Sequence, residues 1–325
     1  MDPLFINKEK IASLLPMNEC IEVMEKMFLS LANGDCLQPL RNIMRLPTGA
    51  GVLGMMPGYA GILNVMGIKV ITVFHANSEV GLPSHQGIVM LFDAKHGQPL
   101  MLFDALEITA IRTAAASAVA TKLLSRKDSS TLAIIGSGEQ AKRHIEAMML
   151  VREIKEINIW SRKKENAKKL AEEISERYPI PVNVSGDIKE AIENADIICT
   201  VTASKEPIVK GEWIKAGTHV NAIGSSMPIA RELDTEAIVR SKLFTDRYES
   251  LFNEAGDFLT PKKEGAITDD HVKAEIGEVL SGTKKGRENE EEITVFKSLG
   301  IAAEDIFSAF HIYEKVTSRE LRATS

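Results

Sequence analysis

The stretch TLAIIGSGEQA at residues 131–141 decides the fold that we expect for this chain. A run of apolar and β-branched residues ends at Gly136, and a helical pattern follows Gly138 and Ala141. A G-x-G-x-x-G/A signature between a strand and a helix permits a tight turn and lets a pyrophosphate approach the backbone. The free N–H groups at the start of the helix then hold the anion. An ordinary tight turn is the alternative, but the flanking strand and helix favour dinucleotide binding.

The composition is typical of a globular protein that is large enough for two domains. The chain has 325 residues, of which 44% are hydrophobic and 26% charged, and its formal net charge is -6. Because it contains no long basic run, we expect no nucleic-acid partner. It also lacks a signal-peptide pattern and any apolar stretch near the roughly 20 residues of a membrane helix. We therefore expect a cytoplasmic protein without a membrane partner.

The cysteines give no sign of a metal site or of disulfide bonds. Cys20, Cys36 and Cys199 do not have the spacing of metal ligands, and three cysteines are too few for a disulfide framework. We expect buried thiols in a reducing compartment, and no metal ion.

Before the glycine-rich stretch, the pattern predicts a helix, a group of strands and a second helix. Residues 16–34 have apolar side chains at helical spacing, and residues 40–74 read as three strands separated by glycines. If residues 41–45 form a strand, Arg41 and Arg45 share a face and could clamp a carboxylate. Two solvated surface arginines are the alternative.

Two basic residues stand among apolar or small neighbours. Lys69 lies inside the apolar run at residues 67–71, where it must meet an anion or lose its proton, which favours a functional role. Arg112 lies in a helix of small residues predicted at 107–124, where a cation also needs an anion. That anion could be a ligand or an internal partner. Ser84 and His85 precede a predicted strand, and spacing alone leaves the role of His85 open between catalytic and structural.

After the glycines, strands and helices alternate, and the end of the second strand indicates the cofactor. An NAD-binding fold of this kind has an acid about 20 residues beyond the glycines, which bonds the ribose hydroxyls. Here residues 160–164 read WSRKK, with no acid and three successive cations that would attract a 2′-phosphate. We predict NADP(H) as the preferred cofactor, with NAD(H) as the alternative. Ligands bind beyond the carboxyl ends of such strands, which places residues 200–202 and 223–226 near the site.

Near the end of the chain, the pattern at residues 275–282 and 294–314 predicts helices, with a segment at 296–300 between them. The fold class that we expect is therefore α/β, with a Rossmann-type doubly wound parallel sheet in the second half of the chain.

Ten motifs together are more specific than any one of them, and over its whole length the chain resembles the ornithine cyclodeaminase/μ-crystallin family. The motifs are MPGYAG (residues 56–61), IKVITVF, LPSHQG, AIRTAAASAVATK, IIGSGEQA, ADIICTVT, GTHVNAIGSS, RELD, IGEVLSG and TVFKSLG. Within the family, PSHQ, IWSRKKENA and Ser226 are most similar to the ketimine-reductase branch, which includes Δ1-pyrroline-2-carboxylate reductases.

The resemblance implies two domains and a homodimer. It implies a Rossmann domain at residues 126–302 and an α/β domain for substrate binding and dimerisation at residues 1–125 and 303–325. The polar stretch at residues 125–130 marks the junction.

The resemblance also implies the site residues. Arg41, Lys69 and Arg112 match the family's carboxylate-binding positions, and Arg41 matches them better than Arg45. Positions that match the dinucleotide site, or that follow from it, are Ser84, His85, Arg112, Thr113, Gly136, Ser137, Gly138, Glu139, Gln140, Ser161, Arg162, Lys163, Asn166, Thr202, Ala203, Ile223 and Ser298. The candidate catalytic residues are Lys69, Arg112, His85 and Ser226, and Glu254 is a weaker further candidate.

One departure from the family pattern argues against one of the family's activities. Cyclodeaminases of the family carry an aspartate that is thought to activate the substrate amine, and Ser226 stands at that position. A hydroxyl cannot act as a carboxylate base at neutral pH, so we do not favour a cyclodeaminase. The family's alanine dehydrogenases have an acid after the second Rossmann strand, which is also missing here.

We therefore expect an oxidoreductase that uses NADPH to reduce the C=N bond of a small cyclic imino acid. It would convert Δ1-pyrroline-2-carboxylate to L-proline and Δ1-piperideine-2-carboxylate to L-pipecolate, in proline metabolism. The alternatives are an alanine or other amino-acid dehydrogenase, an ornithine cyclodeaminase, and a non-catalytic protein that binds NADPH and a ligand.

Overall fold

The computed structural model describes residues 3–323, except for the side chains of His75, Ser78, Glu79 and residues 319–323. The chain divides into two compact units. The first contains the chain up to Thr113 and the chain from Ile301 onward, and the second contains Ala114–Gly300. The break between them lies inside one long helix, α3 (Ala105–Leu124).

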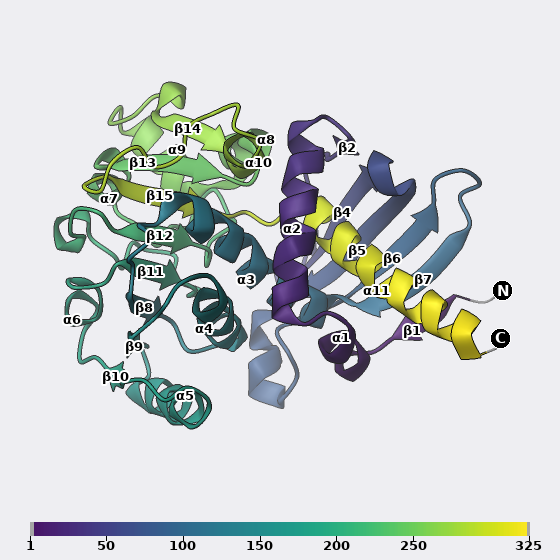
Figure 1. The fold of residues 1–325 in the computed structure, drawn as a ribbon, viewed down its shortest axis with the longest axis horizontal. Coiled ribbons are helices and arrows are strands. Elements are labelled where there is room, and N and C mark those ends of the chain that lie inside the picture. Colours follow the sequence, from purple (N-terminus) through teal and green to yellow (C-terminus); the bar gives the residue numbers. More distant parts are fainter. Residues whose placement is uncertain (1–2, 324–325) are drawn as a thin grey trace. The chain divides into compact units, whose positions relative to one another are not determined.

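The first unit is built on a seven-stranded sheet with the order β1-β7-β6-β5-β4-β2, in which β3 also pairs with β4 (Figure 1). Only the pairing of β1 with β7 is parallel among these described strands. The strands are β1 (Leu4–Ile6), β2 (Cys36–Leu37), β3 (Asn42–Arg45), β4 (Val52–Ala60), β5 (Val65–Val73), β6 (His85–Asp93) and β7 (Pro99–Asp104). Short 3-10 helices lie at η1 (Gly61–Leu63) and η2 (His75–Val80). The strands expected between residues 40 and 74 are confirmed.

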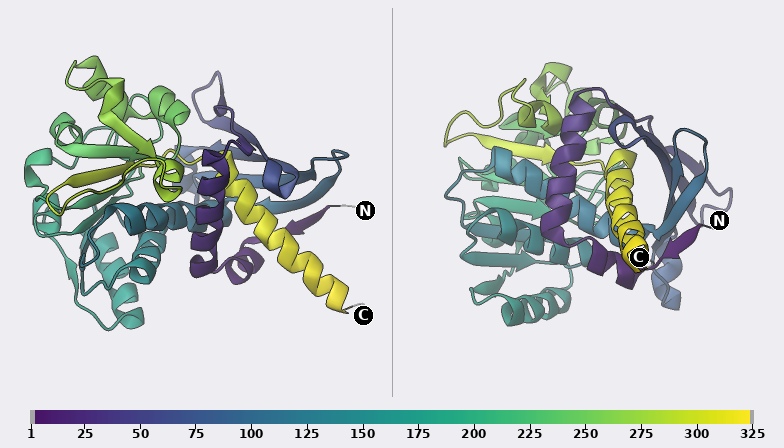
Figure 2. Two further views of the ribbon diagram at one scale, coloured as in Figure 1. Left: turned by 45° about the horizontal axis from the view of Figure 1, so that its top comes forward. Right: turned by 45° about the vertical axis from the view of Figure 1, so that its right-hand side comes forward.

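Helices cover one face of this sheet. They are α1 (Lys8–Leu14), α2 (Met17–Ala32), the first part of α3, and α11 (Ala302–Ala323). Helix α11 packs on β4, β5 and β6 and contacts α2, as the views of Figure 2 show. The predicted helix at 16–34 is confirmed, and its apolar stripe is buried. Lys69 lies on the covered face of β5, paired with Met56 and Val89 on the neighbouring strands.

The opposite face of the sheet, which we call the open face, is apolar and half-exposed. Because directly paired residues share a face, the register places three rows of side chains there. These residues are Met55, Pro57 and Tyr59 on β4, Met66, Ile68 and Val70 on β5, Ile88, Met90 and Phe92 on β6, and Leu102 on β7.

The second unit is an eight-stranded sheet with the order β10-β9-β8-β11-β12-β15-β13-β14, and every pairing in it is parallel. Its strands are β8 (Thr131–Ile135), β9 (Glu156–Trp160), β10 (Val182–Val184), β11 (Ile197–Thr200), β12 (His219–Ala222), β13 (Ser241–Thr245), β14 (Val272–Glu275) and β15 (Ile293–Lys297). The order reverses between β8 and β11, which makes this the topological switch point of a Rossmann-type sheet. The predicted fold class is confirmed.

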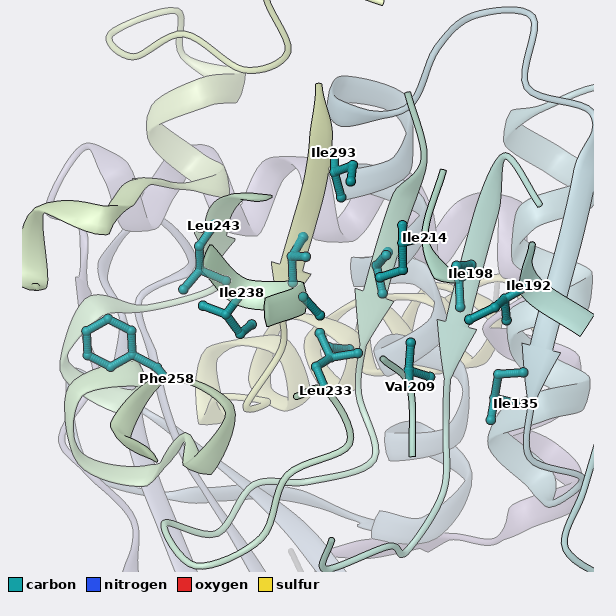
Figure 3. Packing of buried hydrophobic residues seen from close by; sticks show 14 of the residues in the cluster. Ile135, Ile192, Ile198, Val209, Ile214, Leu233, Ile238, Leu243, Phe258 and Ile293 are labelled. Atoms are coloured by element: carbon teal, nitrogen blue, oxygen red, sulfur yellow. The ribbon is translucent and has the colours of Figure 1, made fainter. Parts of the chain in front are cut away.

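Short connections and helices join these strands. The helices are α4 (Glu139–Val151), α5 (Lys164–Arg177), α6 (Ile188–Ile192), α7 (Thr235–Val239), α8 (Tyr248–Glu254), α9 (Gly256–Lys263) and α10 (Ile276–Leu280), with 3-10 turns at η3 (Gly211–Trp213) and η4 (Asp269–His271). The core beneath them is almost entirely aliphatic. Figure 3 shows Ile135, Ile198 and Leu243 from three strands packed with Leu233 and Ile238.

One sequence-based prediction is wrong. The helix expected to begin at residue 294 begins at Ala302, and residues 293–297 form β15 between β12 and β13. All five residues of β15 are buried, because strands in the middle of a parallel sheet are covered on both faces. Such a strand lacks the alternating pattern that identifies a half-exposed strand in a sequence. Its last residue, Lys297, is polar and fits the pattern of an amphipathic helix equally well.

Burial of the thiols is confirmed, because Cys20, Cys36 and Cys199 are all free and buried. Within residues 3–323, no helix combines the length and the apolar character that a membrane crossing needs.

Candidate functional site

In the first unit, Lys69 is held in a buried ion pair. The strand β5 turns its side chain toward α11, where only 3% of the residue is exposed. Its Nζ lies 2.7 Å from Oδ2 of Asp305, in the first turn of α11. The sequence required an anion for this lysine, and the structure supplies one from the far end of the chain.

Arg112 on α3 shares this partner. Its Nε donates to Oδ1 of Asp305 at 3.0 Å, and its Nη1 donates to Oε2 of Glu304. Burial alone would lower the pKa of Arg112, but the two carboxylates outweigh burial and raise it. Of the two partners that the sequence left open, the internal ion pair is therefore present. The neighbouring Thr113 is also buried.

Arg41 acts on the same group electrostatically. Burial lowers the pKa of Lys69, Asp305 raises it, and the positive charges of Arg112 and Arg41 lower it again, to about 8. Arg41 is half-buried just before β3, whereas Arg45 lies exposed at the end of that strand. Of these two arginines, Arg41 is the one whose charge acts on Lys69. We call Arg41, Lys69 and Arg112 the basic cluster.

Ser84 and His85 lie where β6 begins. The Ser84 hydroxyl and Nδ1 of His85 are 2.9 Å apart, and His85 is exposed. This contact fixes the orientation of the imidazole and fits both the structural and the catalytic reading.

In the second unit, the turn after β8 has the geometry that the glycine signature requires. Gly136 has a φ of +133°, and a Cβ there would lie 2.8 Å from the carbonyl oxygen of Val201 on the loop after β11. Only glycine fits this position without strain. A Cβ at Gly138 would meet nothing within 4 Å, and no side chain caps the start of α4. The open space and the N–H groups of the first turn of α4 fit the pyrophosphate of a dinucleotide.

Several residues predicted for the dinucleotide site lie near this turn. Ser137 and Ser161, from the turns after β8 and β9, have their hydroxyl oxygens 2.7 Å apart. Glu139 and Gln140 open α4, and Glu139 pairs with Arg143 at 3.2 Å. The loop after β9 exposes Arg162 and Lys163, and the exposed Asn166 lies at the start of α5.

Three further strand ends carry the remaining predicted residues. Thr202 and the exposed Ala203 follow β11, while Ile223 and the half-buried Ser226 follow β12. Ser298, only 2% exposed, follows β15. Because β11, β12 and β15 are parallel neighbours, these loops lie at one edge of the sheet.

Sequence reasoning missed the buried charges that hold these loops. Asp246, after β13, accepts hydrogen bonds from the N–H groups of Leu299 and Gly300 at 2.6 and 2.8 Å. Glu232 holds the loops after β11 and β12, and Asp305 holds Lys69 and Arg112. The only sequence signal was an acid close to the end of an apolar run, which is too common to identify a site.

A parallel sheet with a glycine turn at its switch point defines an α/β protein of the dinucleotide-binding class. The chain belongs to the ornithine cyclodeaminase/mu-crystallin family, whose profile matches residues 1–320. It is 39% identical over 313 residues to a Δ1-pyrroline-2-carboxylate reductase of Bacillus cereus (96% of each chain), and 38% identical over 320 residues to the ketimine reductase mu-crystallin of Mus musculus (97% and 98%). A solved structure of the Thermococcus litoralis Δ1-pyrroline-2-carboxylate reductase, in complex with NADH and L-proline, matches with a TM-score of 0.95 and 42% identity over 98% of both chains.

Proposed function

We propose that this chain is an oxidoreductase that reduces cyclic ketimine carboxylates with NAD(P)H. It converts Δ1-pyrroline-2-carboxylate to L-proline and Δ1-piperideine-2-carboxylate to L-pipecolate. The observation that carries this proposal is the basic cluster, in a chain that also has a complete dinucleotide turn and resembles reductases of this class over nearly its whole length.

The basic cluster binds the substrate carboxylate. Its two buried cations are already oriented by Asp305 and Glu304, so little side-chain ordering is needed when the substrate arrives. A planar guanidinium binds a carboxylate through two parallel hydrogen bonds, which fix the orientation of the substrate ring as well as the position of its charge.

The second unit binds the dinucleotide. The turn at Gly136 and the start of α4 hold the pyrophosphate, and Thr202, Ile223 and Ser298 line the nicotinamide half. When bound, the reduced cofactor supplies a hydride to the carbon of the C=N bond. Such a transfer needs the reacting atoms about 3–3.5 Å apart, so the residues that orient each ligand decide the rate.

The cofactor that we propose is NADPH, with NADH as the alternative. Ser161, Arg162, Lys163 and Asn166 would receive the 2′-phosphate, because the loop after β9 offers cations and a hydroxyl but no acid before Glu165. The Thermococcus litoralis relative was solved with NADH, which supports NADH as the alternative.

The reaction asks for no strong base, which agrees with Ser226 at the position of the cyclodeaminase aspartate. A protonated C=N bond already accepts a hydride, and its nitrogen keeps its proton and becomes the amine of the product. His85, held by Ser84, is the residue that we propose to polarise the substrate or to supply a proton.

The proposal is tested by following NADPH oxidation with Δ1-pyrroline-2-carboxylate, beside NADH and beside the Arg41→Ala variant. We expect turnover that prefers NADPH, and in Arg41→Ala a KM for the imino acid raised about tenfold or more. Lys315→Ala is the matched control, because Lys315 belongs to the same unit and pairs with Glu19 on α2.

Turnover that stays fast in Arg41→Ala would contradict the carboxylate clamp. No turnover in a protein that binds NADPH tightly would exclude the reductase and favour a ligand-binding protein. Formation of product only with added ammonia would favour an amino-acid dehydrogenase.

We also propose that the protein is a homodimer joined through the open face. Monomers rarely expose a continuous apolar surface of this kind, and the rows on β4, β5 and β6 form one.

A further inference from the structure

The carboxylate of Glu232 holds two loops at the carboxyl edge of the parallel sheet. Its Oε1 accepts hydrogen bonds from the N–H and the hydroxyl of Thr202, both at 2.7 Å. Its Oε2 accepts from the N–H of Gly224 and from the hydroxyl of Thr200, also at 2.7 Å. Four donors thus surround two oxygens, which is the full hydrogen-bonding capacity that an ionised carboxylate offers.

This carboxylate is buried and lies close to a second buried ion pair. Glu232 has no exposed surface, and burial outweighs the positive charge of Lys297 and raises the pKa of Glu232. Lys297 is itself fully buried; its Nζ donates to the carbonyl of Ser225 at 2.6 Å and pairs with Asp257 at 3.0 Å. Asp257 in turn accepts the N–H of Glu232 at 2.9 Å. The charged groups therefore form one connected assembly beneath the loops.

The two loops that Glu232 joins are very close together. A Cβ at Gly224 would lie 2.1 Å from the carbonyl oxygen of Thr202 and 2.5 Å from Oε1 of Glu232. No side chain could be accommodated between the loops, so the carboxylate sets their spacing directly. A shift of Glu232 would therefore act on both Thr202 and Gly224, the residue after Ile223.

We infer that Glu232 is a positioning residue for the nicotinamide half of the dinucleotide. It acts through the loops after β11 and β12, which carry Thr202, Ile223 and Ser226. This inference rests on the proposed function, because it takes those loops to be the ones that contact the nicotinamide. It assigns Glu232 no contact with substrate or cofactor.

The same sheet contains an acid that allows a matched comparison. Asp196 precedes β11 at the opposite edge, and accepts the N–H groups of Ser130 and Thr131 at 2.9 and 3.0 Å. It is also a mostly buried carboxylate that holds two segments together. If both buried carboxylates only stabilise the fold, Glu232→Gln and Asp196→Asn should change the affinities for the whole cofactor and for its fragment in the same way.

The experiment compares a whole cofactor with a fragment that lacks the nicotinamide. Affinities of NADPH and 2′-phospho-ADP-ribose are measured by calorimetry for the wild-type protein, Glu232→Gln and Asp196→Asn, with NADH and ADP-ribose as a second pair. In Glu232→Gln an amide N–H₂ must face donors, so we expect NADPH to bind about tenfold more weakly while the fragment binds as before. In Asp196→Asn we expect the ratio of the two affinities to stay at the wild-type value.

Thr200→Val provides a second test should Glu232→Gln fold poorly. It removes one hydrogen bond to Glu232 from inside β11 without changing side-chain size, and we expect a smaller loss in the same direction. Equal losses for cofactor and fragment, or no loss for either, would overturn the inference. A wild-type protein that binds NADPH but reduces no imine would overturn only the proposed reaction. A wild-type protein that binds neither dinucleotide would overturn both.

Discussion

At the scale of single residues, the site depends on buried charges whose partners are distant in sequence. Asp305 contacts Lys69 and Arg112, and lies 193 positions from Arg112 along the chain. An isolated buried cation would be very costly, so the fold tolerates these two only because α11 brings its first turn to them. The same arrangement shifts the pKa of Lys69, and under the proposed function it therefore sets the pH range of substrate binding.

We expect kcat/KM for the imino acid to fall as the pH rises through about 8, where Lys69 loses its proton. Carboxylate binding needs the ammonium form, and the bound carboxylate itself favours that form, so kcat should fall at a higher pH than kcat/KM. The measurement is a pH profile of initial rates at saturating NADPH.

Asp305→Asn should move this fall to lower pH, because Asp305 raises the pKa of Lys69. Glu304→Gln is the control, because Glu304 pairs with Arg112, whereas Asp305 is the acid that pairs with Lys69. A profile that stays in place in Asp305→Asn would contradict the assignment of the titrating group to Lys69.

The effect of the same group on stability has the opposite sign. The folded-state pKa of Lys69 is below the value of 10.5 that an unperturbed lysine has, so between about 8 and 10.5 the unfolded chain binds more protons than the folded chain. The contribution of Lys69 to the free energy of unfolding therefore rises with pH in that window. If activity falls above pH 8 while the free energy of unfolding does not, the loss of activity is due to deprotonation of Lys69 and not to unfolding.

At the scale of elements, the loop between β9 and α5 is the part whose local sequence should determine the choice between NADPH and NADH. Exchanging its cations should change cofactor choice without changing the fold, because Arg162 and Lys163 are exposed. We expect the double variant Arg162→Ala, Lys163→Ala to bind NADPH about ten- to a hundredfold more weakly, with little change for NADH.

The control for this loop is Lys168→Ala, which removes an exposed cation further along α5 and should change neither affinity. Cofactor titrations followed by fluorescence measure all three proteins. Equal losses for NADPH and NADH in the double variant would show that the loop does not contact a 2′-phosphate.

Some elements could be predicted from the hydrophobic pattern of the sequence, and one could not. The helix α2 was predictable because only one of its faces is buried, so apolar residues recur at helical spacing. The strands β4 and β5 were predictable because glycines separate their runs of apolar residues. The strand β15 was not, because it is buried on both sides and its partners β12 and β13 are determined by the whole sheet.

At the scale of the whole molecule, the open face predicts the oligomeric state. Ile68→Glu places a charge in the middle of the rows of apolar side chains, where a dimer interface would bury it at a high cost. We expect a dimer for the wild-type protein and a monomer, or a dimer that dissociates at micromolar concentrations, for Ile68→Glu. Sedimentation equilibrium measures both.

Leu150→Glu is the matched control for the open face, because Leu150 is 53% exposed on α4 in the other unit. It should remain dimeric. A wild-type protein that is monomeric, or an Ile68→Glu variant that stays dimeric, would contradict an interface on the open face.

The sequence alone determined the local parts of this protein. The glycine turn at Gly136, the basic loop after β9 and the positions of Lys69 and Arg112 could all be read from neighbouring residues, because turns, helices and half-buried strands depend on short-range sterics and on one buried face. Only the tertiary structure decided which acids neutralise the buried cations, where β15 enters the sheet, and that Glu232 spaces the loops after β11 and β12. These outcomes depend on contacts between residues far apart in the chain, and the sequence around each of them gives no sign of its partner.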